Sequence, residues 1–144
     1  MVESVGFFNG GPSVNTNTAS SFYSSEKATT TSSIKIGRMN ASDYGFATDN
    51  VSSCRSTLLS TWGSGTNKTN CVTNHNWLYL SSSYPMLTMT TVTGRNTMYR
   101  VNAVGNPYSA NANQTGLVSA VIYLKNSVLY DSGDGSSDLP YTLK

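Results

Sequence analysis

The stretch NWLYLSSSYPMLTMTTVTGRNTMYRVNA (residues 76–103) decides the fold class, because it contains one strand-like segment after another. In WLYL, Trp77 and Tyr79 fall on one face of an extended chain, while Leu78 and Leu80 fall on the other. The segment 76–80 therefore predicts a half-buried strand whose tryptophan helps to form the core. A tryptophan that contacts a ligand is the alternative.

The strand pattern continues to the end of the chain. The run 86–93 is rich in β-branched residues and is strand-like. In YRVNA (residues 99–103), the polar Arg100 and Asn102 alternate with apolar residues, which is typical of a strand with one solvent-exposed face. The nearly apolar run 117–124 predicts a central strand that is covered on both sides. We therefore expect a mainly β fold with one or two short helices (α+β), built on a twisted antiparallel sheet.

The first half of the chain has weaker signals. Residues 34–39 (IKIGRM) alternate and predict the first firm strand, and Ser42 or Asp43 is a candidate helix N-cap after it. A short helix is expected there or over residues 53–60.

Residues 1–33 are rich in Asn, Ser, Thr and Gly, and they predict a polar N-terminal arm of loops and one or two short strands. The aromatic pairs 7–8 and 22–23 can anchor this arm to the body. We expect residues 34–144 to form a single β-rich extracellular domain.

Charge and length exclude several classes of protein. The 144 residues suffice for one domain, and 11% of them are charged, with a formal net charge of +2 and no basic run that could follow a phosphate backbone. No apolar run reaches the roughly 20 residues that cross a bilayer. The start MVESVGFF lacks a basic flank and a long apolar segment, so we expect a mature or truncated fragment. Nucleic acid is excluded as an expected partner, and so is a membrane segment.

The two cysteines predict a disulfide. Cys54 and Cys71 would enclose 16 residues, and only His75 could join them as a further zinc ligand, so no structural metal site is expected. Two reduced core cysteines are the alternative. A disulfide indicates an oxidising compartment and hence export.

Five segments together carry a family resemblance: residues 35–47, 76–79, 98–106, 120–128 and 133–143. Their order over about residues 34–143 resembles a C-terminal extracellular domain of surface and pilin-like proteins of Gram-positive gut bacteria. More distantly, the chain is similar to C-type-lectin-like and formylglycine-generating-enzyme-like folds. The resemblance implies display at the cell surface.

The chain also departs from these families. Ser119 and Ala120 stand where the surface-protein family usually has Arg-Pro. The acidic-Pro-Asn and Trp-Asn-Asp signatures of calcium-dependent lectins are missing, so calcium-dependent sugar binding is not implied. The cysteine chemistry of the enzyme is not implied either.

Catalytic groups are scarce. His75 could act as a general base, but a loop histidine is the favoured interpretation, and no G-x-S-x-G turn presents a serine. The run 131–138, which contains three aspartates, looks like a calcium loop but lacks the ligand spacing and the closing glutamate. A surface turn is therefore the favoured interpretation, and a weak calcium site is the alternative. We expect no enzyme, no catalytic residues and no cofactor.

Binding is the better-supported function, because aromatic side chains stand among Asn, Ser and Thr, which offer rigid contact area and hydrogen bonds. The loop 106–116 is a candidate contact region, with an ordinary solvated connection as the alternative. The candidate contact residues are Tyr79, Tyr84, Arg95, Arg100, Tyr108, Asn111 and Asn113. The sequence thus predicts a cell-surface adhesion domain whose partner is a glycan or a host or matrix protein. The alternative is a pilin-like filament subunit that associates with itself and lacks its N-terminal hydrophobic helix.

Overall fold

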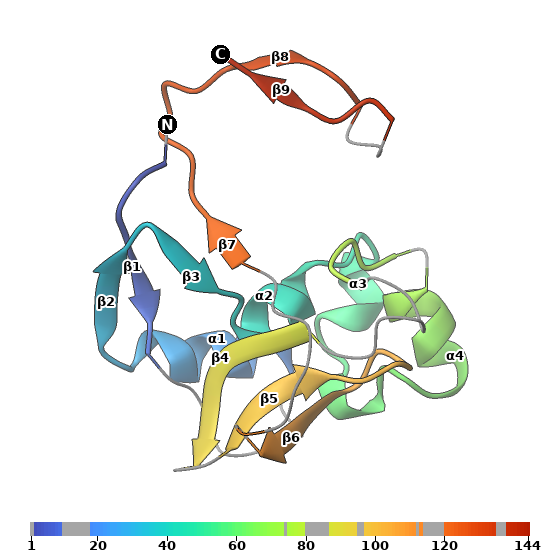
Figure 1. Cartoon of the computed structure of the whole chain (residues 1–144). Helices are drawn as coiled ribbons and strands as arrows, with labels where there is room; N and C mark the ends of the chain where they lie inside the picture. Colours follow the sequence, from blue (N-terminus) through green and yellow to red (C-terminus); the bar gives the residue numbers. More distant parts are fainter. Residues whose placement is uncertain are drawn as a thin grey trace.

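The computed structural model describes residues 2–9, 18–73, 75–79, 87–94, 97–111, 113, 120–134 and 138–144 (Figure 1). The described helical elements lie between residues 19 and 72, and the strands form several small antiparallel sheets, which confirms the α+β expectation. The C-type-lectin-like arrangement stays a prediction. The helical elements are α1 (Ala19–Lys27), α2 (Ala41–Phe46), α3 (Val51–Cys54), η1 (Leu59–Thr61), α4 (Gly65–Asn67) and η2 (Lys68–Val72). The strands are β1 (Val5–Phe8), β2 (Thr31–Ile34), β3 (Ile36–Arg38), β4 (Leu87–Gly94), β5 (Thr97–Val101), β6 (Pro107–Asn111), β7 (Ala120–Ile122), β8 (Tyr130–Ser132) and β9 (Thr142–Leu143).

The strands pair in four small antiparallel sheets. β4, β5 and β6 form a three-stranded meander at the base of the molecule in Figure 1, and β1 pairs with β2. β3 pairs with β7, which places residues 36–38 beside residues 120–122. β8 and β9 form a C-terminal hairpin that stands above the body in Figure 1.

The polar segment before residue 34 contributes β1, α1 and most of β2 to the same body. α1 begins after Thr18, whose hydroxyl accepts a hydrogen bond from the backbone N–H of Ser21 at 3.3 Å. Its inner face buries Phe22, which meets the ring of Tyr99 on β5 edge to face at 5.2 Å between centroids. Sequence periodicity missed α1 because serines occupy most of its exposed positions.

α1 and α2 approach each other closely at a glycine. A Cβ added at Gly45 would lie 2.6 Å from the Cβ of Ala19, so the two backbones are as near as their smallest side chains allow. The N-cap of α2 is Asn40, two residues before the predicted Ser42, and the backbone N–H of Asn40 donates to the Asp43 carboxylate at 2.8 Å.

One hydrophobic core joins the helices to β5. Trp62 is fully buried there and packs on Tyr44, whose hydroxyl donates to the carbonyl of Gly105 at 3.0 Å. Gly105 has φ +90°, and an added Cβ would collide with Val72, so this turn requires glycine. The other fully or almost fully buried apolar members are Ala19, Phe22, Met39, Ala41, Cys54, Leu59, Cys71, Tyr99 and Val101.

The structure corrects the predicted strand at residues 76–80. Residues 76–79 form an isolated bridge and a turn, and the backbone N–H of Tyr79 donates to the carbonyl of Asn76 at 3.1 Å. Trp77 is 67% exposed, so the prediction that it helps to form the core is wrong. Its backbone N–H bonds to Ala47, which fixes this turn against the end of α2 with the indole outside. Trp62 is the core tryptophan.

The prediction of a covered central strand at residues 117–124 is wrong for its described part. β7 is three residues long and pairs with β3, and Ile122, Tyr123 and Leu124 are each 40% to 48% exposed. Residues 117–119 lie outside the described residues.

The strands β8 and β9 form a hairpin at the C-terminal end. The ammonium group of Lys144 pairs with Asp131 at 2.8 Å, and the ring of Tyr130 meets that of Tyr141 edge to face at 5.9 Å. Leu129, Tyr130, Leu139, Tyr141 and Leu143 are all more than 40% exposed, so the hairpin presents apolar side chains to solvent. Within the described residues, no helix has the length and apolar character needed to cross a bilayer.

Candidate functional site

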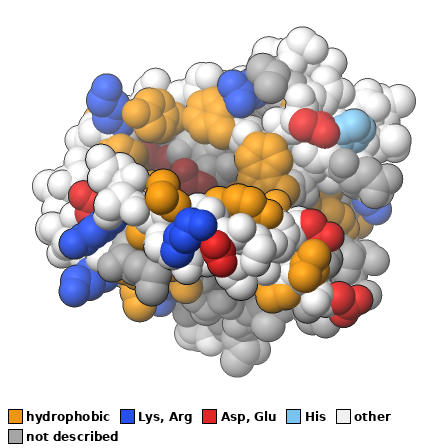
Figure 2. Space-filling view, turned by 90° about the horizontal axis from the view of Figure 1, so that it is seen from above, with side chains coloured by type: hydrophobic (Ala, Val, Ile, Leu, Met, Phe, Trp, Pro, Cys, Tyr) orange, Lys and Arg blue, Asp and Glu red, His pale blue; other side chains and the backbone are white. Residues whose placement is uncertain are grey.

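The principal candidate site is a hollow on the upper face of the molecule. Figure 2 shows the molecule hollowed in this view from above, with acidic side chains deep inside and hydrophobic side chains around the opening. The cavity has a volume of about 330 Å³. Its lining comes from β1, α1, the start of α2 and the chain after β7: Val5, Gly6, Phe7, Phe8, Tyr23, Asn40, Ser42, Asp43 and Tyr123.

Four aromatic side chains line the hollow. Phe7 meets Tyr123 edge to face at 5.5 Å between centroids, and Phe8 meets Tyr23 in the same manner at 6.2 Å. The first pair joins β1 to the chain after β7, and the second pair joins β1 to α1. Tyr23 is 42% exposed and Tyr123 is 48% exposed, so both rings are open to a ligand.

The polar part of the lining is built at the start of α2. Ser42 donates its hydroxyl proton to the carboxylate of the fully buried Glu26, and its backbone N–H donates to the same carboxylate at 3.3 Å. This double contact holds α2 against α1 and fixes the position of the neighbouring Asp43. Cap formation and helix packing therefore orient the acidic group of the hollow.

Asp43 is an acid in an environment that disfavours its charge. Burial raises the pKa of Asp43, and the backbone hydrogen bond from Asn40 lowers it by a smaller amount. The pKa of Tyr123 is also raised, first by burial and then by the negative charge of Asp43. Among the described residues, Asp43 has no cationic partner, so its charge is compensated by one backbone N–H.

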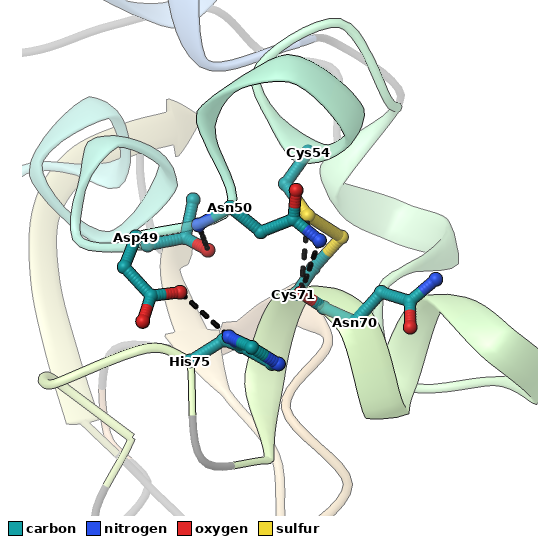
Figure 3. Close-up of polar contacts among 7 residues, drawn as sticks. Asp49, Asn50, Cys54, Asn70, Cys71 and His75 are labelled. Atoms are coloured by element: carbon teal, nitrogen blue, oxygen red, sulfur yellow. Dashed lines mark hydrogen bonds and ion pairs between the residues drawn. A yellow bond between two sulfur atoms is a disulfide. The ribbon is translucent and has the colours of Figure 1, made fainter.

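A second polar cluster surrounds the disulfide (Figure 3). Cys54 and Cys71 are bonded, with their Cα atoms 5.5 Å apart, which confirms the predicted disulfide. Beside it, His75 Nδ1 lies 2.6 Å from a carboxylate oxygen of Asp49, and the Asn50 amide donates to the carbonyl of Asn70 at 3.3 Å. The imidazole and the carboxylate are 39% and 65% exposed, so this pair lies at the surface and not in a pocket.

The His75–Asp49 pair lacks the rest of a nucleophilic site. Within the described part of the chain, no serine or threonine hydroxyl is hydrogen-bonded to the imidazole. The sulfurs nearby are joined to each other and cannot act as thiolates. No group of three or more potential metal ligands occurs among the described residues, including the described part of 131–138.

None of the predicted contact residues that the structure describes lines the hollow. Tyr79 is half-buried, and its hydroxyl donates to the carbonyl of Ala103 at 2.7 Å, which makes it part of the scaffold. Arg100 is 2% exposed, so the prediction that it lies on a solvent-exposed face is wrong. Tyr84 and Arg95 lie outside the described residues.

The predicted contact loop 106–116 is partly a strand. Residues 107–111 form β6, which pairs with β5 and buries Pro107 and Ala110. Tyr108 is half-buried, while Asn111 and Asn113 are exposed at the far end of that strand. Residues 112 and 114–116 lie outside the described residues.

The hollow itself was not predicted from the sequence. Two signals were available: the aromatic pairs 7–8 and 22–23 in an otherwise polar segment, and Asp43 in the first turn of a short helix. Sequence reasoning assigned the pairs an anchoring role, and Phe7 and Phe22 do anchor. Their neighbours Phe8 and Tyr23 line the hollow.

Comparison of the chain with family models, with curated proteins and with solved structures found no match.

Proposed function

We propose that this chain is a non-enzymatic extracellular binding domain, displayed on a bacterial surface protein or appendage, that holds its ligand in the hollow. One observation carries the proposal: aromatic rings and polar groups from four parts of the chain converge on a cavity of about 330 Å³. That volume lies within the roughly 300–1,000 Å³ range of small-molecule sites, which combine apolar walls with a few polar groups.

The extracellular assignment is supported by the disulfide, because such bonds persist in oxidising compartments. The resemblance of residues 34–143 to extracellular domains of surface proteins supports the same compartment. The surface-exposed His75–Asp49 pair favours binding over catalysis, because no nucleophile is hydrogen-bonded to it among the described residues.

The test is a glycan array and a panel of mucin and matrix proteins, probed with the native chain and with two variants. Tyr23→Ala removes a half-exposed wall of the hollow, and Trp77→Ala removes a more exposed aromatic ring that does not line it. We expect a bound partner that Tyr23→Ala loses and Trp77→Ala keeps. Absence of binding to every probe contradicts the binding proposal. Equal loss of binding in both variants contradicts the choice of site. A product formed in a hydrolase screen and lost in His75→Ala contradicts the non-enzymatic assignment.

A second candidate function is a structural subunit that assembles with copies of itself. The apolar side chains of the β8–β9 hairpin favour it, because five large apolar residues exposed on one short hairpin are typical of a surface covered in an assembly.

Sedimentation over a range of protein concentrations tests this alternative. Leu143 on the hairpin and Leu58 on the body are both 43% exposed, so Leu143→Ser and Leu58→Ser form a matched pair. Assembly that is lost only in Leu143→Ser supports the structural function. A monomer at all concentrations contradicts it.

A further inference from the structure

The hollow combines a carboxylate with aromatic rings, and this combination selects for positive charge. Asp43 donates no hydrogen bond when ionised, and one of its oxygens already accepts from Asn40. The other oxygen has no hydrogen-bond partner among the described residues. A ligand in the cavity can therefore donate a hydrogen bond to this second oxygen.

The electrostatics of the hollow point in the same direction. Burial raises the pKa of Asp43, which means that its negative charge is poorly solvated by water. A cation beside the carboxylate would stabilise this negative charge in place of water. An anion would be repelled by this negative charge, which one backbone N–H compensates only in part.

The rings add a second attraction. The face of an aromatic ring carries partial negative charge and attracts ammonium groups within about 6 Å of its centre. Phe7, Phe8, Tyr23 and Tyr123 line the same cavity as the carboxylate. A bare metal ion would find a single carboxylate there, so an organic cation with an apolar frame suits the lining better.

Resting on the proposed binding function, we propose that the hollow recognises an organic ammonium group: the ammonium lies against the Asp43 carboxylate and the attached apolar frame lies against the Phe8 and Tyr23 rings. The group can be a primary amine, as on a lysine side chain, or a methylated one, as on choline. These two sources differ in hydrogen bonding, because only the primary amine donates to the carboxylate. Their relative affinity therefore reports whether the acid or the rings dominate.

The experiment is titration calorimetry of the full chain with three probes: butylammonium, choline and 3,3-dimethylbutan-1-ol, the neutral isostere of choline. We expect both cations to bind more tightly than the alcohol. Asp43→Asn should weaken the binding of both cations roughly tenfold to a hundredfold, because the negative charge that attracts them is lost. Asp49→Asn is the matched control, since Asp49 is an acid outside the hollow, and it should bind the cations as the native chain does.

The outcomes separate this inference from the function on which it rests. Equal affinity for choline and the alcohol overturns the ammonium proposal but leaves the hollow as a binding site. No binding of any probe, together with a glycan or protein partner that Tyr23→Ala still binds, overturns both. Unchanged choline affinity in Asp43→Asn overturns the role of the acid.

The pH dependence of the native chain gives a test that needs no variant. Protonation of Asp43 removes the charge that attracts the cation, so cation affinity should fall as the pH is lowered through the raised pKa of Asp43. The alcohol should show no such fall. Affinities for choline and the alcohol that change together with pH contradict the proposal, even if Asp43→Asn does not fold.

Discussion

Reduction of the Cys54–Cys71 bond should destabilise this chain by about 3 kcal/mol. The two residues are separated by 17 positions, so the bond closes a loop of 16 intervening residues. The chain-entropy model gives about 3 kcal/mol at 25 °C for a loop of that size, because the crosslink restricts the unfolded chain. Both sulfurs are buried in the main core, so reduction in place leaves the packing nearly unchanged.

The assay is urea unfolding of the oxidised and the reduced native chain, followed by fluorescence and circular dichroism. With a slope of about 1–3 kcal/mol/M, a loss of about 3 kcal/mol moves the midpoint by roughly 1–3 M. A Cys54→Ala/Cys71→Ala variant should be less stable than the reduced native chain, because it also loses the packing of two buried sulfurs.

The reasoning is refuted if the reduced chain lies within about 1 kcal/mol of the oxidised chain, since the unfolded loop would then gain little freedom on reduction. Equal stability of the reduced chain and the double-alanine variant would refute the packing part alone. Coincident transitions from the two probes are the control that unfolding is two-state.

Three further predictions concern the core and the hollow. Gly45→Ala should cost about 1–3 kcal/mol, because its methyl group would overlap that of Ala19 between α1 and α2; urea midpoints measure it. Trp62→Ala should cost about 3–5 kcal/mol and Trp77→Ala less than about 0.5 kcal/mol, because the first indole is buried and the second is 67% exposed; equal losses would contradict the assignment of the core tryptophan. The pKa of Asp43 is raised above 3.8, so the folded chain binds that proton more tightly, and stability falls as the pH rises from below 3.8 through the raised value. The free energy of unfolding of Asp43→Asn should not show this fall when it is measured over the same pH range.

Sequence patterns predicted the parts of the fold that depend on local chemistry. Residue type and alternation predicted the disulfide and a short helix near Asp43. They also predicted strands at residues 34–39, 86–93 and 99–103, where the structure has strands at 36–38, 87–94 and 97–101. The helix α1 was missed because its serines mask the two apolar positions that it buries. Its assignment to the body depends on tertiary packing of Phe22 against Tyr99, which no local pattern reveals.

The two tryptophans show where alternation misleads. WLYL would place Trp77 and Tyr79 on one face of a strand, but the backbone N–H of Trp77 donates to the carbonyl of Ala47 and the following residues turn, so no strand forms at residues 77–79 and the indole stays outside. Trp62 stands in a polar, glycine-containing segment without periodicity, and it is fully buried because the disulfide-closed loop folds over the core. Burial at both sites is decided by partners distant in sequence.

The hollow exists because two small features keep its wall in place. Gly37 lies under the ring of Phe7, and any side chain at position 37 would collide with that ring and push it from the wall. Asp43 uses one oxygen to accept the backbone N–H of Asn40 and leaves the other for a ligand. An asparagine at position 43 keeps an oxygen for the Asn40 contact but loses the charge. Asp43→Asn can therefore separate recognition from folding, whereas Gly37→Ala should disturb both, and a Gly37→Ala chain that binds as well as the native one would show that the Phe7 ring does not form part of the site.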